Sequence, residues 1–226
     1  MLAVEPHDDM RRVLDEKKLH GVESKNGLST SIPSENESVD AVIAAQAFHW
    51  FANMDSLKEI HRVLKPHGVL GMIWNVEDYN APQSHKATTS WEQAMQDHIF
   101  TQDDDQPRFR HEQWRKVFDD QLATGPMALI TAAEPIFALP LGIHEEQWKV
   151  YLEKDRVWDR LCTLSQIAIT EGKERERVRK LFFDAVEAED TEVDDQGRVA
   201  VHGATYTAWT SSIPTTGASK LWEKQS

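Results

Sequence analysis

The sequence predicts an α/β protein with a mostly parallel sheet covered by helices on both faces. Two observations support this class. Short, continuous apolar runs such as VLGMIW, 69–74, have the composition of strands that are buried on both faces. Along the first third of the chain these runs alternate with stretches whose apolar residues recur at helical spacing, as in repeated strand–helix units.

The amino-terminal residues predict one strand and one helix. The apolar run 2–4 is typical of a short strand. Apolar residues at helical spacing then predict a helix over 8–18, with Asp8 or Asp9 as its cap. The pair Asn26-Gly27 indicates the turn that follows.

A second strand–helix–strand unit is predicted over 39–74. The run VDAVIAAQAF, 39–48, is continuous and apolar, as in a strand buried on both faces. The stretch 55–66 places its apolar residues on one helical face and ends at Pro66, which cannot continue a helix. The run 69–74 completes the unit.

The remaining two thirds predict further helices and strands. Helices are expected at 90–100, 112–122 and 172–186, strands at 135–139 and 198–209, a long amphipathic stretch at 145–164, and a turn at 194–197. The acidic run 101–106 is interpreted as a solvated loop.

Composition limits the classes of partner. A formal net charge of -13 disfavours nucleic acid and anionic membrane surfaces. The single cysteine, Cys162, forms no intramolecular disulfide, and no Cys/His cluster has metal-ligand spacing. Neither a run of about 18 apolar residues nor a secretory signal is present, so a cytoplasmic location is expected.

Candidate site residues follow from the predicted topology. In parallel α/β sheets, ligands bind at the carboxyl ends of the strands. The residues at those ends are Glu5, the segment 46–50 and the segment 75–78. We therefore expect the functional site among them.

The same segments carry a resemblance to a known family. VEP with its helix, NGLSTSIP, SVDAVIAAQAFHWF and EIHRVLKPHGVLGMIWN together resemble the class I S-adenosylmethionine-dependent methyltransferases, a Rossmann-like fold. Within that family the chain resembles small-molecule enzymes whose fourth strand ends in A-x-H-W-F. The stretch from WNVEDYN through PRFRHEQWRKVF resembles fungal members associated with secondary metabolism. The run 39–74 is the most specific part.

The resemblance implies a set of residues that bind S-adenosylmethionine. Glu5 matches the acid that accepts hydrogen bonds from the ribose hydroxyls, since a carboxylate offers two acceptor oxygens to a diol. Leu28 and Ser29, after Gly27, match the segment beside the adenine. Many family members have an acid where this chain has Leu28, so one contact to the base is missing.

The resemblance also implies a substrate side. The backbone of Gln46 and Ala47 matches the segment that passes the methionine moiety, while His49 and Trp50 match positions near the substrate mouth. A neutral imidazole at His49 is a candidate base that takes a proton from a hydroxyl or carboxyl group. The alternative is that the two rings cap and pack the end of the sheet.

Two further substrate residues are candidates. Asn75 is expected at the same mouth, although polar loop residues often only face water. Trp91, together with Trp114 and Trp148, is a candidate aromatic wall over the strand ends. The alternative for these indoles is packing on helix faces, the more common role of buried aromatic residues.

One feature of the family is not found in this sequence. The family's first strand and its glycine-rich loop precede the strand that ends in Glu5, and no G-x-G occurs among the 10 glycines. In the family strand order 3-2-1-4-5-7-6, the absent strand separates the strands that end at Glu5 and near Gln46. Three outcomes are expected: the flanking strands close on each other, a partner chain fills the slot, or the sequence starts inside a longer, N-terminally truncated product.

The sequence is interpreted as one domain over 1–226. Residues 1–75 are the remnant of the cofactor-binding core, 76–190 a mostly helical cap with further helices, and 191–212 the terminal strand region. The expected function is methyl transfer to a small-molecule metabolite; the acceptor atom is not implied. The alternative is a methyltransferase-like protein that acts as a cofactor-independent cyclase or isomerase, or as a partner subunit. A homodimer that covers the sheet edge is also predicted.

Overall fold

The computed structural model describes residues 1–122 and 135–214, which fall into two compact units. Of the described residues, unit 1 contains 1–72, 114–122, 135–143 and 208–214. Unit 2 contains Ile73–Gln113 and His144–Thr207.

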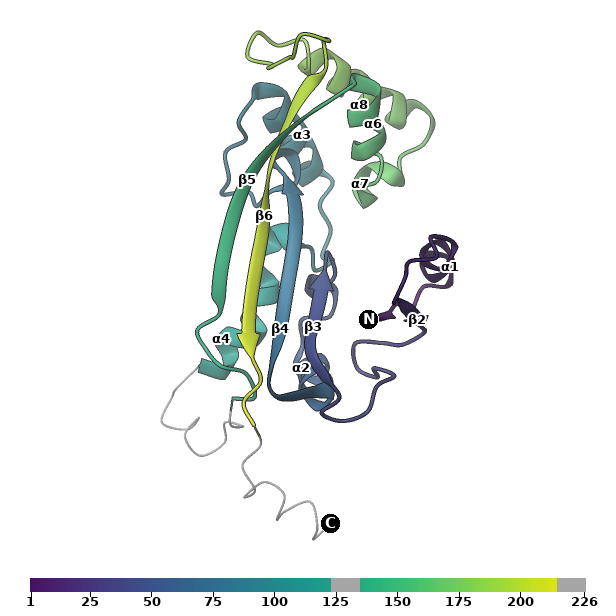
Figure 1. Cartoon of the computed structure of the whole chain (residues 1–226). Coiled ribbons are helices and arrows are strands. Elements are labelled where there is room, and N and C mark those ends of the chain that lie inside the picture. Colours follow the sequence, from purple (N-terminus) through teal and green to yellow (C-terminus); the bar gives the residue numbers. More distant parts are fainter. Residues whose placement is uncertain (123–134, 215–226) are drawn as a thin grey trace. The chain divides into compact units, whose positions relative to one another are not determined.

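A small parallel sheet forms the start of unit 1 (Figure 1). It pairs β1 (Leu2–Val4) with β2 (Glu23–Lys25). The helix α1 (Asp8–Glu16) connects the two strands and begins with acidic residues in its first turn, which the helix dipole favours. The predicted strand–helix pair is present.

The larger sheet has four strands in the order β3-β4-β6-β5. Their bounds are β3 (Val39–Ala45), β4 (Leu64–Glu77), β5 (Gly142–Leu152) and β6 (Val199–Ser211). In Figure 1, β6 runs opposite to β4. The predicted α/β class is confirmed, and the order reproduces the 4-5-7-6 part of the expected topology.

Within the described ranges, β1 and β3 belong to separate sheets and no ladder joins them. The expectation that these two strands close on each other is therefore wrong for this structure. Parallel β1–β2 pairing satisfies one edge of β1, while β4 pairs with one edge of β3. Each flanking strand therefore keeps one edge that is not part of a ladder in the described residues.

The core of unit 1 comes from α2 (Met54–Val63) and alternate residues of β4. Leu57, Ile60 and Val63 recur at helical spacing and are at most 1% exposed, as predicted. Asn53 caps the start of the helix, and its side chain accepts a hydrogen bond from the Ser56 backbone N–H at 2.9 Å.

Burial of β3 differs from the prediction. Ala44 is the buried residue of this strand, and Ile43 is 64% exposed. The apolar run predicted a strand with both faces covered, but β3 is an edge strand of its sheet. Apolar composition alone does not distinguish these two situations.

Unit 2 is built on helices α3 (Ser90–Thr101), α6 (Lys154–Leu161), α7 (Ser165–Ala168) and α8 (Gly172–Ala185). Trp91, Trp158 and Phe182 lie in its hydrophobic core, where the Phe182 ring contacts both indoles. The helices predicted at 90–100 and 172–186 are thus present.

Several predicted elements have other bounds or another type. The stretch 145–164 divides into the end of β5 and then α6, because its first part alternates in side-chain direction. The segment 135–139 forms only an isolated bridge from Phe137 to Ser212. The expected helix at 112–122 is a short 3-10 turn, Gln113–Arg115, followed by α4 (Lys116–Leu122).

Candidate functional site

Glu5 lies where the aligned carboxyl ends of β1 and β2 meet. Val4 pairs with Lys25 in register, and the Glu5 backbone N–H donates to the Lys25 carbonyl at 3.1 Å. The segment that follows Lys25 therefore starts beside Glu5. This edge is where a parallel sheet binds ligands.

The carboxylate of Glu5 is oriented by the start of α1. Its Oε1 atom accepts a hydrogen bond from the His7 backbone N–H at 2.8 Å. The Glu5 carbonyl also accepts from Arg11 Nη1 at 2.7 Å. These two bonds fix the backbone and one oxygen, and a carboxylate has further acceptor positions for a ligand.

Gly27 brings the second segment against β1. A Cβ atom at Gly27 would lie 2.7 Å from Val4 Cγ1 and 2.7 Å from Pro33 Cδ. Only glycine permits this approach without displacing its neighbours. Sequence analysis identified a turn here but missed the contact with Val4, since spacing along the chain does not reveal which strand the turn packs on.

Leu28 and Ser29 occupy the turn that follows. Leu28 and Ser31 exchange two backbone hydrogen bonds of 3.3 and 3.0 Å, and the Leu28 side chain is 55% exposed. The Ser29 hydroxyl accepts from Ser56 Oγ at 2.9 Å. An exposed apolar residue and an anchored hydroxyl are therefore adjacent in the turn that follows Gly27.

The third segment begins at Gln46, directly after β3. Gln46 has φ of 54°, the left-handed region that non-glycine residues rarely adopt. Such a conformation costs about 1 to 3 kcal/mol and is found often at functional sites. The Ala47 carbonyl then accepts from the Trp50 backbone N–H at 2.9 Å, which starts a 3-10 turn over Phe48–Trp50.

Phe48 anchors this turn. The sequence analysis includes Phe48 in the strand predicted over 39–48 and does not predict the 3-10 turn. Its side chain is fully buried, with the Phe51 ring centroid at 5.5 Å and the Phe118 ring centroid at 5.6 Å. With Phe48 buried, His49 stays partly exposed and Trp50 is 49% exposed.

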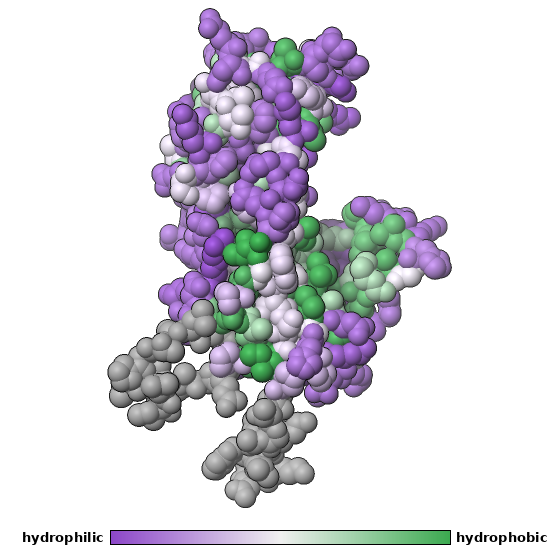
Figure 2. Space-filling model, turned by 60° about the vertical axis from the view of Figure 1, so that its left-hand side comes forward, coloured by the Kyte–Doolittle hydropathy of each residue, from purple (hydrophilic) through white to green (hydrophobic). Residues whose placement is uncertain are grey.

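The rings of His49 and Trp50 lie with centroids 5.0 Å apart, tilted by 43°. Figure 2 shows one face of the molecule, on which apolar side chains, coloured green, reach the surface. Half exposure of Trp50 is compatible with both a substrate contact and packing at the end of the sheet.

Asn75 and Trp91 belong to unit 2. Asn75 is exposed, and its Oδ1 atom accepts from Thr205 Oγ1 at 2.6 Å. Trp91 is fully buried, with Tyr79 and Phe182 against its ring. This burial favours the packing interpretation of Trp91 over a substrate wall.

The two acids at the end of β4, Glu77 within the strand and Asp78 after it, have structural partners. Arg160 Nε donates to Glu77 Oε1 at 2.6 Å. Asp78 Oδ2 accepts from both the backbone N–H and the hydroxyl of Thr88, at 2.8 and 2.7 Å. These bonds hold the loop after β4 rather than present free carboxylates.

Unit 2 also contains a buried acid that sequence analysis missed. Burial raises the pKa of Glu92, which is completely inaccessible to solvent. Its carboxylate accepts from Thr89 Oγ1 at 2.7 Å and from the His202 backbone N–H at 2.7 Å, and it lies 3.1 Å from His202 Nδ1. Glu92 is one of several polar residues in the stretch 90–100, and its spacing does not distinguish it from the others.

Within the ranges 1–122 and 135–214, no group of three or more His, Cys, Asp or Glu side chains has metal-binding geometry. Likewise, no helix in those ranges has the length and apolarity needed to cross a membrane.

The glycine turn packs against the strand that ends in Glu5, at the edge where parallel α/β sheets bind ligands. Residues 1–72 match the family described as a methyltransferase domain. The chain is 47% identical over 88 residues to an uncharacterized methyltransferase-like protein of Schizosaccharomyces pombe, covering 39% of this chain and 34% of that protein. It is 40% identical over 78 residues to an uncharacterized methyltransferase of Mycobacterium tuberculosis, covering 34% of this chain and 32% of that protein.

Solved structures show the same fold over a larger part of the chain. A putative methyltransferase of Bacillus halodurans has a TM-score of 0.52 at 17% identity, covering 94% of this chain and 83% of that chain. A putative type II methyltransferase of Anaeromyxobacter dehalogenans has a TM-score of 0.52 at 16% identity, covering 94% and 80%. The chain thus has methyltransferase homologues and a class I methyltransferase fold. The matched part spans about a third of the length of its curated relatives.

The described residues fit the adenosine part of S-adenosylmethionine. Glu5 offers carboxylate oxygens at the β1–β2 edge, and Gly27 leaves the backbone close to β1. The exposed Leu28 lacks the acceptor that many family members provide for the adenine amino group. The fit is therefore better for the ribose than for the base.

Proposed function

We propose that this chain is an S-adenosylmethionine-dependent methyltransferase that acts on a small-molecule metabolite, in secondary-metabolite biosynthesis. The observation that carries the proposal is the juxtaposition of Glu5 with the Gly27 turn at the carboxyl ends of β1 and β2. In this proposal Glu5 accepts the ribose hydroxyls, and Leu28 and Ser29 lie beside the adenine.

Gln46 and Ala47 complete the cofactor side of the proposal. The left-handed backbone at Gln46 turns the chain directly after β3, where the proposal places the methionine part of the cofactor. The cofactor supplies an activated methyl group on its sulfonium, so the protein contributes mainly binding and orientation.

His49 is the proposed base on the acceptor side. A neutral imidazole accepts the proton that a hydroxyl or carboxyl nucleophile loses during methyl transfer. Trp50, half exposed with its ring centroid 5.0 Å from that of His49, is proposed to cover the acceptor's apolar part. Asn75 is proposed to contact a polar group of the acceptor.

Calorimetric titration with S-adenosylmethionine and S-adenosylhomocysteine tests the cofactor side. We expect micromolar binding by the purified 226-residue chain. Glu5→Gln keeps the size of the side chain but removes its charge, and hydrogen bonds to charged groups contribute about 1.5–3 kcal/mol. Binding should weaken by roughly tenfold to a hundredfold.

Glu23→Gln is the matched control, because Glu23 is an exposed acid at the opposite, amino end of β2. Equal affinity of wild type and Glu5→Gln for the cofactor would contradict the assignment of Glu5. His49→Gln should lower methyl transfer while leaving binding of S-adenosylhomocysteine unchanged, and a loss of binding would place His49 on the cofactor side.

The second candidate function is that of a methyltransferase-like protein without methyl transfer. The exposed Leu28, where many family members have an acid, favours it. A folded chain that releases no heat with either ligand would support this alternative and direct assays to cyclisation, isomerisation or a partner subunit. Conversely, tighter S-adenosylhomocysteine binding by Leu28→Asp would support an adenine beside this turn.

The proposed environment is the cytoplasm, with a small-molecule substrate and neither nucleic acid nor a membrane as partner. The homodimer that covers the edge of β3 is also part of the proposal. The exposed Ile43 and a strand with one charged residue, Asp40, support it, because unprotected edges favour pairing. A monomeric mass in light scattering would exclude it.

A further inference from the structure

Helix α2 presents a second face that the hydrophobic core does not use. Ser56, Glu59 and Arg62 recur at intervals of three residues along this helix. Residues with that spacing lie on one side of a helix, so the three polar groups form a stripe. The segment they contact is 29–36, which follows the Gly27 turn.

Each residue of the stripe bonds to a different point of that segment. Ser56 Oγ donates to Ser29 Oγ at 2.9 Å. Glu59 Oε1 accepts from the Ile32 backbone N–H at 2.7 Å, and Arg62 Nη2 donates to the Ile32 carbonyl at 3.0 Å. The backbone of Ile32 is therefore held through both its donor and its acceptor.

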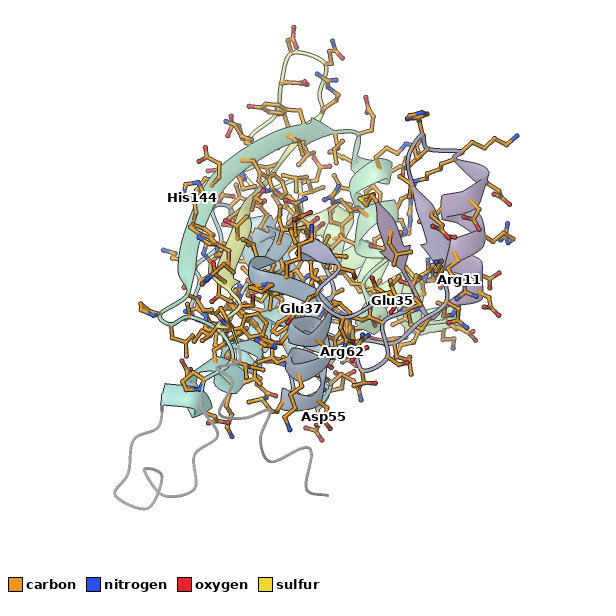
Figure 3. The ribbon with its side chains drawn as sticks, turned by 60° about the horizontal axis from the view of Figure 1, so that its bottom comes forward. Arg11, Glu35, Glu37, Asp55, Arg62 and His144 are labelled. Carbon is orange, nitrogen blue, oxygen red and sulfur yellow. The ribbon has the colours of Figure 1, made fainter. Side chains whose placement is uncertain are left out.

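Arg62 extends the contact toward β3. Its Nη1 atom donates to the Ser34 carbonyl at 3.0 Å and to Asn36 Oδ1 at 2.6 Å. The Arg62 carbonyl accepts from the Glu37 backbone N–H at 2.8 Å, where Glu37 has φ of 49°. Figure 3 shows Arg62 beside the segment that bears Glu35 and Glu37.

The guanidinium of Arg62 is itself fixed by Glu59. Two parallel hydrogen bonds, from Nε to Oε2 at 2.8 Å and from Nη2 to Oε1 at 2.7 Å, join the pair. The hydrogen bond from Arg62 also holds the pKa of Glu59 below its usual value. A planar fork with fixed donors directs several bonds at once, which a lysine ammonium does not do.

We infer that Ser56, Glu59 and Arg62 are positioning residues that set the cofactor affinity of the 27–29 turn. This inference rests on the proposed function, in which that turn lies beside the adenine. The turn is fixed at one end by the Gly27 contact with Val4 and at the other by this stripe. Loss of the stripe leaves a loop that has to be ordered when the ligand binds, which weakens affinity.

The test compares Arg62→Met and Arg62→Lys with wild type in two measurements made well below the melting temperature. Calorimetry gives the affinity for S-adenosylhomocysteine, and hydrogen–deuterium exchange reports the amides of 28–37. We expect about tenfold weaker binding and faster exchange for Arg62→Met, because an ordering cost then opposes binding. Arg62→Lys should restore only a small part of the affinity.

Lys65→Met is the matched control. It removes the 2.8 Å ion pair from Lys65 to Asp40 just beyond α2, which does not involve the segment 29–36. This variant should bind and exchange like wild type. If Arg62→Met fails to fold, Ser56→Ala, which removes one hydrogen bond, takes its place with the same expected directions.

The outcomes separate two failures. Binding by wild type with unchanged affinity in Arg62→Met overturns the positioning role and leaves the proposed function intact. Unchanged exchange at 28–37 in Arg62→Met also overturns the positioning role. No binding by folded wild type overturns both the proposed function and this inference.

Discussion

Replacement of Gly27 by alanine tests the packing that joins the two cofactor segments. The added methyl carbon would lie 2.7 Å from both Val4 Cγ1 and Pro33 Cδ, and 3.2 Å from the Ser31 carbonyl oxygen. Favourable contacts between carbon atoms are about 3.5–4.0 Å long, so each neighbour must retreat by roughly 1 Å. Overpacking of this kind costs about 1–3 kcal/mol.

Gly71→Ala is the comparison. Among the described residues, a Cβ at Gly71 would have one neighbouring atom within 4 Å, which is Ile43 Cδ1 at 2.8 Å. Ile43 is 64% exposed and its terminal carbon is free to turn away, so we expect almost no loss. For a chain of this size, 1 kcal/mol shifts the melting temperature by about 2–4 °C.

Thermal unfolding followed by circular dichroism measures the difference between the two variants. Gly27→Ala should melt about 4–8 °C lower than Gly71→Ala, the shift that corresponds to about 2 kcal/mol. It should also bind S-adenosylhomocysteine more weakly, since the turn is displaced from Glu5. Equal melting temperatures for the two variants would refute the argument that Gly27 is required for the approach to β1.

Three further predictions concern pH and packing. The hydrogen bond from Arg62 lowers the pKa of Glu59 from its ordinary 4.5. The ionised Glu59 carboxylate therefore contributes fully to the free energy of unfolding above pH 4.5, and this contribution is lost as the pH falls through the pKa of Glu59 in the folded state. Chemical unfolding at about pH 6 and about pH 3 should therefore show a smaller loss for Glu59→Gln than for wild type. Burial, with the neighbouring Glu145 carboxylate, raises the pKa of Tyr206 to about 12, and an absorbance titration should find it lowered in Glu145→Gln. Gly203→Ala would place a Cβ 2.5 Å from Trp148 Cζ2, and calorimetric unfolding should show a loss of about 1–3 kcal/mol; an unchanged melting temperature would contradict that close contact.

Local patterns predicted several elements because their cause is local. Helical spacing of Leu57, Ile60 and Val63 identified α2, and the structure buries all three. Within 145–152 the apolar alternation covers only Trp148, Val150 and Leu152, which is too short to indicate a strand clearly, and the structure places β5 there. Spacing shows the periodicity of an element, but pairing with β6 is a long-range event that leaves little local trace.

The candidate site divides in the same way. Position after an apolar run was enough to select Glu5 and Gln46, since strand ends are defined along the chain. The left-handed backbone of Gln46 and the burial of Phe48 required the structure, because both depend on what surrounds the turn after β3. For Trp91 the sequence did not distinguish a substrate wall from a core position. Its complete burial in the structure favours the core position.

By itself the sequence determined the α/β class, the strand–helix units of the first third and the strand ends that carry the candidate residues. Only the tertiary structure decided that Gly27 packs on β1, that the polar stripe of α2 holds the segment 29–36, and that β1 and β3 lie in separate sheets. The physical reason is the separation along the sequence between the residues that interact. Propensity, capping and periodicity act over a few residues, whereas close packing and hydrogen bonding join residues that the sequence separates by 20 or more positions.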